Sequence, residues 1–205
     1  MAEPAGDVAP SLAAHWRTID ELAALVGAYC WLERRLFELA GGWAASRGDG
    51  GLEAPVDAGA AACRVWCAAA SRRHGLLAGR WAERLPVRAG VDAAAFVTPP
   101  GGPLAAALEG WTGAAPRAGL GLLVETLLPW VAGLYASHLA RATPASEAPV
   151  VEVLVEARRA AAGEIRGGQS LLQRQPGGET PSRHEREPVE RALARSDVFP
   201  AVRAS

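Results

Sequence analysis

The chain has 205 residues, about half of them apolar, which is enough for one compact domain with a buried core and excludes a globally disordered protein. Its 21 basic and 22 acidic residues leave a formal net charge of −1, which argues against a general binder of nucleic acids or anionic membranes. All 21 basic residues are arginine, and 45 residues are alanine, a bias that indicates a GC-rich bacterial genome rather than a chemistry.

The ends of the chain and its cysteines predict a location. The cysteines are Cys30, Cys63 and Cys67. An odd and small number of cysteines favours a reducing compartment, so we expect a cytoplasmic protein. Residues 1–16 have neither a basic start nor a continuous apolar stretch, and we interpret them as a flexible leader. Residues 119–139 approach the length of a membrane span, but Glu125 lies near their middle, so we expect a buried core helix and no membrane association.

Four long segments have the apolar spacing and the end signals of helices. The first begins at a Thr18-x-x-Glu21 capping box. The second has Asp57 as its N-cap and ends at Pro86, and the third contains Pro129, where we expect a kink. The predicted helices span about 18–45, 57–85, 116–142 and 149–173.

The connections between these helices are short, long and short along the chain. About 30 residues rich in proline and glycine separate the second helix from the third, and Leu104–Glu109 could form a small helix there. This order predicts an all-α fold: an antiparallel four-helix bundle over residues 17–174, made of two hairpins with a long crossover. The polar residues 175–205 predict a mobile charged tail with at most one short helix.

Helical phase puts two polar residues inside apolar stripes. On the first helix, Glu33 lies on the stripe that includes Tyr29 and Leu36; on the second, His74 lies on the stripe that includes Leu77. An antiparallel hairpin would bring Glu33 opposite His74. The alternatives are that the first stripe turns outward at Glu33, or that an arginine satisfies it, and that His74 is a hydrogen-bonded core residue.

The third and fourth helices each add a charge. Glu125 is a charge near the centre of the apolar third helix, so a helix wrapped on all sides would need a partner for it inside the fold. On the fourth helix, Arg158 lies on the apolar stripe, whereas Glu156 falls on the opposite, solvated face. We predict that Arg158 supplies the counter-charge for Glu33 or Glu125.

This arrangement resembles the ferritin-like superfamily. In that family the first and third helices each give a glutamate, and the second and fourth each give Glu-x-x-His; together they hold two iron or manganese ions. Glu33 and Glu125 match the single glutamates, and His74 matches the histidine of the second-helix motif, but Ser71 stands where that motif has glutamate. By spacing, Glu156 matches the fourth-helix glutamate, and an arginine follows in the place of the histidine.

The resemblance implies a degenerate metal site. Its metal-binding residues would be Glu33, His74, Glu125 and Glu156, with Ser71 and Arg158 in a polar pocket beside them. Because a full set of four carboxylates and two histidines cannot be assembled, we expect no cofactor and no efficient diiron oxidase. We expect a protein that acts through a polar pocket between helices or through a partner surface.

Two alternatives remain open. One is a metal-dependent oxidoreductase or hydroxylase of the diiron-carboxylate type, using iron or manganese. The other is a non-catalytic subunit that pairs with a related, active chain. A homodimer or a related-chain partner is therefore expected, and nucleic acid is not.

Overall fold

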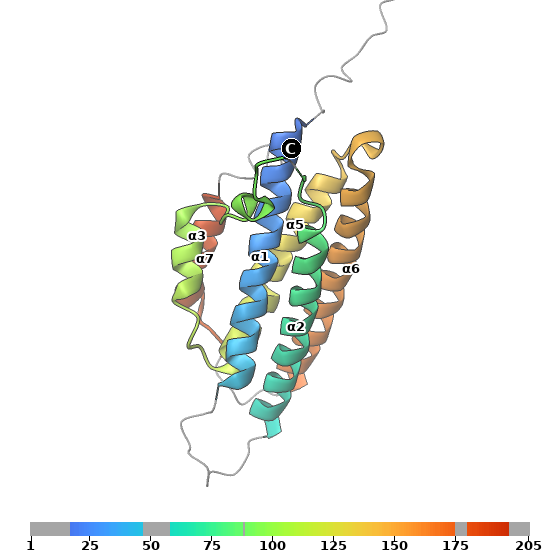
Figure 1. The fold of residues 1–205 in the computed structure, drawn as a ribbon. Helices are drawn as coiled ribbons and strands as arrows, with labels where there is room; N and C mark the ends of the chain where they lie inside the picture. The colour runs from blue at the N-terminus through green and yellow to red at the C-terminus, as the bar shows by residue number, and fades with distance from the viewer. Residues whose placement is uncertain (1–16, 47–57, 88, 175–179, 197–205) are drawn as a thin grey trace, which may run out of the picture.

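The computed structural model describes residues 17–46, 58–87, 89–174 and 180–196, and these residues form an all-helical fold (Figure 1). The predicted leader, residues 1–16, lies outside the described residues. So do the predicted N-cap Asp57 and residues 175–179 and 197–205 of the predicted tail.

Four long helical stretches lie side by side (Figure 1). They are α1 (Ile19–Ala45); α2 (Ala58–Ala82); the run of α4 (Pro116–Leu122), the π-helical turn η3 (Leu123–Leu127) and α5 (Leu128–Leu139); and α6 (Pro144–Arg174). The crossover after α2 holds the 3-10 turn η2 (Ala93–Phe96) and α3 (Gly102–Glu109). The last element is α7 (Arg183–Ala194), which pairs with α3 on one flank.

The N-terminus of α1 forms the predicted capping box. The Thr18 hydroxyl accepts a hydrogen bond from the Glu21 backbone N–H at 3.2 Å, and the Glu21 carboxylate accepts one from the Thr18 N–H at 2.7 Å. The start of α6 differs from the prediction: it begins at Pro144, because a proline is tolerated in the first turn, where its missing N–H has no helical partner.

Part of the predicted mobile tail is a packed helix. Ser182 and Glu185 form a second capping box at the start of α7, with hydrogen bonds of 2.7 and 3.3 Å. The amphipathic spacing of α7 then buries Val189, Ala192 and Leu193 in the core that it shares with α3. The tail therefore contains the one short helix that the sequence allowed, but this helix packs on α3, which its charged outer face gave no reason to expect.

The third long stretch is not a regular α-helix. The Leu128 N–H bonds the Leu123 carbonyl, five residues back, so this hydrogen bond spans one more residue than the bonds of an α-helix. Pro129 follows directly and has no N–H to offer the preceding turn. The π-helical turn therefore stands where we expected a kink, and it shifts the phase of the residues before Pro129 relative to those after it.

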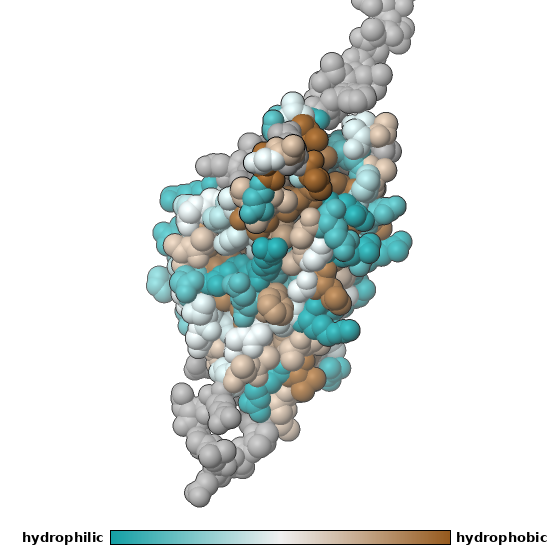
Figure 2. Space-filling model, in the orientation of Figure 1, coloured by the Kyte–Doolittle hydropathy of each residue, from teal (hydrophilic) through white to brown (hydrophobic). Residues whose placement is uncertain are grey.

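Pro116–Leu139 is long and apolar enough, by length and composition, to cross a membrane. In this fold, 67% of its most apolar window is buried. On the face formed by α1 and α2, hydrophilic and hydrophobic side chains are interspersed (Figure 2).

The packing of α4 on α1 requires a glycine. A Cβ atom added at Gly119 would lie 2.2 Å from the indole of Trp43, which is fully buried. To avoid this overlap, either the indole or the backbone of α4 would have to move within the packed core. We expect Gly119→Ala to lower the free energy of unfolding by about 1–3 kcal/mol in urea denaturation, despite the higher helix propensity of alanine. Gly163→Ala in α6 is the matched control, because a Cβ there meets no atom within 4 Å. An equal or stabilising effect of the two substitutions would show that the close approach is absent.

Candidate functional site

The structure brings Glu33 and His74 together inside the fold. Their exposed fractions are 1% and 2%, and the imidazole Nδ1 lies 2.6 Å from Oε2 of Glu33, so its N–H donates to the carboxylate. The contact follows from the packing of α1 against α2, which turns the two apolar stripes toward each other. Tyr135 of α5 donates its hydroxyl to the other carboxylate oxygen, Oε1, at 2.5 Å.

A second glutamate lies on the opposite edge of the same imidazole. Glu164 of α6, 5% exposed, has its Oε2 atom 3.3 Å from Nε2 of His74. These two atoms form an ion pair, although neither has a hydrogen-bond partner of good geometry among the described residues. The Nε–H of Arg73 donates to the other oxygen of Glu164. Arg73 is partly exposed, so the network runs from the core to the surface of α2.

The charges of this network balance when His74 is protonated. Two carboxylates then face one guanidinium and one imidazolium. Burial by itself would lower the pKa of His74, but the adjoining carboxylates of Glu33 and Glu164 outweigh it and raise that pKa to about 10. Burial likewise opposes ionisation of Glu164, but its contacts with His74 and Arg73 hold its pKa below the ordinary value. His74 is therefore a buried imidazolium at neutral pH.

The structure does not bring the other predicted metal ligands to this site. Glu125 is exposed and pairs with Arg186 of α7, so the third helix is not wrapped on all sides at this position and its carboxylate needs no partner inside the fold. Glu156 is exposed on α6, and its Oε2 atom lies 3.3 Å from Nη2 of Arg80. The prediction of a metal site that includes Glu125 and Glu156 was wrong in these two positions.

The predicted pocket residues also lie elsewhere. Arg158 is exposed, so the guanidinium of this network comes from Arg73, not from α6. Ser71 is buried, but its hydroxyl donates to the backbone carbonyl of Phe37 at 2.8 Å and so ties α2 to α1. Glu33, His74 and Glu164 are all buried, so the network belongs to the core.

Glu164 had a sequence signal that we missed. It follows Ala157 by seven residues and Ala161 by three, and it precedes Gly168 by four, so it shares their face of α6. All three neighbours are buried. Their side chains are small, however. We assigned the buried face of this helix from its large apolar residues, and that assignment did not include Glu164.

A second buried histidine network lies near the turn between α5 and α6. The hydroxyl of Tyr29 lies 3.1 Å from Nδ1 of His138, and Nε2 of His138 lies 2.8 Å from Oε2 of Glu147. Nη1 of Arg17 lies 3.0 and 3.2 Å from the two oxygens of Glu147, and the backbone N–H of Thr143 donates to the same carboxylate at 3.3 Å. This network ties the start of α1 to the α5–α6 turn.

The two histidines differ in charge. Burial lowers the pKa of His138, so its ring is neutral at neutral pH. Its partners then fix the tautomer: the Tyr29 hydroxyl donates to Nδ1, and Nε2–H donates to Glu147. Arg17 and Glu147 already neutralise each other. Each network is thus uncharged overall, with His74 protonated in one and His138 neutral in the other.

An aromatic layer separates the two networks. The ring centroids of Tyr29 and Tyr135 are 5.1 Å apart in an edge-on arrangement, and Trp81 contacts both rings at 4.9 and 5.8 Å. Both phenols are fully buried, and burial raises their pKa well above the ordinary value. They are therefore hydrogen-bond donors in this fold, and not bases.

The residues around His74 do not fit a metal ion. Within the described residues, no group of three or more His, Cys, Asp or Glu side chains converges on one point. Glu33 and Glu164 lie on opposite edges of one ring, and their remaining oxygens hold Tyr135 and Arg73. A metal-binding imidazole must also be neutral, whereas the carboxylates of Glu33 and Glu164 raise the pKa of His74 and so favour its protonated form.

Comparison of the chain with family models, with curated proteins and with solved structures finds no match.

The network predicts a large effect of removing one carboxylate. Glu33→Ala would leave the Nδ1–H of His74 and the Tyr135 hydroxyl without an acceptor in the core, so we expect the free energy of unfolding to fall by about 3–5 kcal/mol. Glu38→Ala on the same helix and Arg158→Ala on α6 are controls. Both residues are exposed, and each change should cost less than about 0.5 kcal/mol in the same urea titration. A cost of Glu33→Ala close to that of the controls would contradict the network.

The raised pKa of His74 predicts a loss of stability at alkaline pH. Because its pKa in the folded chain, about 10, exceeds its ordinary value of 6.5, its stabilising contribution is fully present below about pH 6.5 and is lost as the pH rises through 10. The chain contains no lysine, which removes one group that usually titrates in this range. Urea denaturation of the wild type and of His74→Gln at several pH values measures the effect. The stability difference between them should shrink toward pH 10, and a constant difference would contradict the assignment.

Proposed function

We propose that this chain is a ferritin-like protein, an antiparallel four-helix bundle in which an ion-paired network occupies the place of the metal centre. We further propose that it acts by binding at its surface and not by metal-dependent oxidation. The bundle is supported by the order of four long helical stretches, with a long connection between α2 and α4 and a short one between α5 and α6. It is also supported by polar residues that converge from all four stretches: Glu33, His74, Tyr135 and Glu164.

One observation carries the proposal: both ring nitrogens of His74 face carboxylates, on opposite edges of a buried ring. A protonated imidazole has no lone pair for a metal ion. The carboxylates that a metal would need are held by Tyr135 and Arg73. The buried charges balance within the chain, and this arrangement needs no added ion.

The second candidate is a metal-dependent oxidoreductase, and one observation favours it. Glu33, His74 and Glu164 are side chains of the types that bind iron or manganese, and they come from three helices to one cluster. For this candidate, His74 would have to lose its proton and one glutamate would have to leave its present partner.

The protonation of His74 distinguishes the two candidates directly. In ¹⁵N NMR spectra at pH 8 we expect both ring nitrogens of His74 to carry a proton, whereas His138 should give the spectrum of a neutral ring. His74→Gln and His138→Gln assign the two sets of signals. A neutral His74 at this pH would overturn the proposal.

Metal content is the complementary measurement. The protein is purified from cells grown with iron and manganese, and bound metal is measured per chain. We expect far less than one ion per chain, with no difference between wild type and Glu33→Ala. Near-stoichiometric metal that disappears in Glu33→Ala and His74→Ala, but not in Glu38→Ala, would establish the oxidoreductase candidate instead.

A further inference from the structure

Both tyrosines of the chain, Tyr29 and Tyr135, lie in the aromatic layer, and both are fully buried. The fold places a proton acceptor beside each phenol. Tyr29 donates to Nδ1 of His138 at 3.1 Å, and Tyr135 donates to Glu33 at 2.5 Å. Trp81 contacts both phenol rings. Phenols and indoles lose a single electron more readily than most side chains, so this layer is a place where an oxidised state can reside.

His138 is set to take the proton of Tyr29. Its Nε2–H donates to Oε2 of Glu147 at 2.8 Å, which leaves the lone pair of Nδ1 for the Tyr29 hydroxyl. Burial lowers the pKa of His138 and so keeps its ring neutral. A phenol that has lost an electron is a far stronger acid than an imidazolium, so it can still protonate this ring. The proton needs to move only along a hydrogen bond that already exists.

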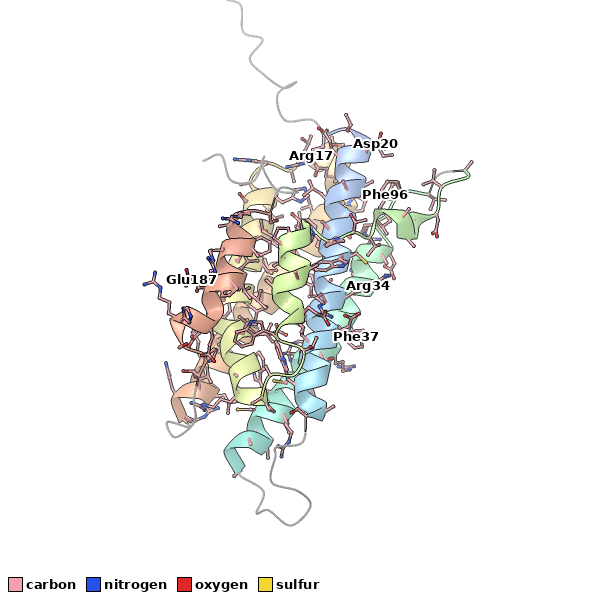
Figure 3. All side chains as sticks on the ribbon, turned by 90° about the vertical axis from the view of Figure 1, so that its left-hand side faces the viewer. Arg17, Asp20, Arg34, Phe37, Phe96 and Glu187 are labelled. Carbon is pink, nitrogen blue, oxygen red and sulfur yellow. The ribbon has the colours of Figure 1, made fainter. Side chains whose placement is uncertain are left out.

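The surroundings of His138 suit the charge that such a transfer creates. The positive charge would lie on an imidazolium next to the carboxylate of Glu147, and not on a phenol ring among apolar side chains, where it would be costly. Arg17, the other partner of Glu147, lies at the end of the bundle where α1 begins (Figure 3). There solvent can replace Glu147 as the partner of Arg17, which leaves the carboxylate to His138.

Tyr135 is less suited to the same step. Its acceptor, Glu33, is also the counter-charge of the His74 imidazolium. A proton moved to Glu33 would leave that imidazolium with Glu164 as its remaining carboxylate in the core. The acceptor of Tyr29 is a neutral ring, so we expect an oxidised state of the aromatic layer to settle on Tyr29.

We propose that Tyr29 and His138 form a reversible one-electron redox site, whose oxidant is an outer-sphere electron acceptor such as an oxidised transition-metal complex. The O–H bond of Tyr29 breaks, one electron passes to the complex, and the proton bonds to Nδ1 of His138. The products are a neutral tyrosyl radical, an imidazolium and the reduced complex. Return of the electron from that complex, and of the proton from Nδ1, restores both side chains. The site contains no member of the His74 network, so it does not rest on the proposed function.

Photochemical oxidation of the full-length protein at pH 7 tests this site. Tris(bipyridine)ruthenium(II) is excited by light with persulfate as the sacrificial electron acceptor, and the frozen sample is recorded by electron paramagnetic resonance. We expect a neutral tyrosyl radical, whose spectrum narrows when the protein carries ring-deuterated tyrosine. No radical, or a radical on Trp81 that ring-deuterated tyrosine does not narrow, would overturn the proposal.

Two matched variants locate the radical. Tyr29→Phe should abolish the tyrosyl signal, whereas Tyr135→Phe should leave its yield unchanged, although each removes one buried hydroxyl from the same layer. Circular dichroism shows whether each variant is folded. Loss of the signal in Tyr135→Phe with its retention in Tyr29→Phe, or equal loss in both folded variants, would overturn the assignment to Tyr29.

The destination of the proton is measured in unaltered protein labelled with ¹⁵N-histidine. Electron–nuclear double resonance should show an exchangeable proton and a histidine nitrogen coupled to the radical. Both couplings should disappear in His138→Gln, whose amide cannot take the proton, and persist in His74→Gln. A radical without these couplings in the unaltered protein would show that the proton goes to another base. That result would overturn the proposal even if His138→Gln does not fold.

Discussion

The buried imidazolium of His74 is the constraint on which the rest of the structure depends. A charge in the core is tolerated only when partners surround it, and each of the four long helical stretches supplies a member of its network: Glu33, His74 with Arg73, Tyr135, and Glu164. Apolar contacts alone permit helices to slide or rotate past one another. Sliding α6 by one turn would separate Glu164 from both cations, so the network fixes the register of the helices, as polar core residues do in some coiled coils.

The sequence predicted the all-helical fold, and the start of α1 agrees with its predicted cap at Thr18, whereas α6 begins at Pro144 and includes Pro149, where its start was expected. The burial of Glu33 and His74 followed from regular helical phase, because large apolar residues flank both positions. Helical phase could not decide the other two glutamates. The third helix is apolar nearly all round, so its sequence did not show that Glu125 lies on the outer surface, and the small neighbours of Glu164 concealed the inward face of α6.

The second network could not be predicted from the sequence, because its members come from distant segments. Arg17 precedes the first helix, Tyr29 lies within it, and His138 and Glu147 lie on either side of a turn. Their proximity depends on how the start of α1 packs against the α5–α6 turn, which no local pattern records. The opposite protonation of His74 and His138 is likewise a tertiary property, since it is set by whether the carboxylates nearby already have a cation of their own.

The π-helical turn connects the interior of the protein to its flank. Its additional residue sits between Leu122 and Leu128, and everything that follows on the same helix is rotated by that insertion. Deleting one residue there would restore ordinary helical hydrogen bonding and turn α5 by about 100°. Tyr135 would then lose Glu33, and Leu134 would leave the wall beside α7. The inserted residue thus sets both the contact of Tyr135 with Glu33 in the core and the position of Leu134 next to α7 on the flank. Neither contact could be changed by a deletion in this turn without a change in the other.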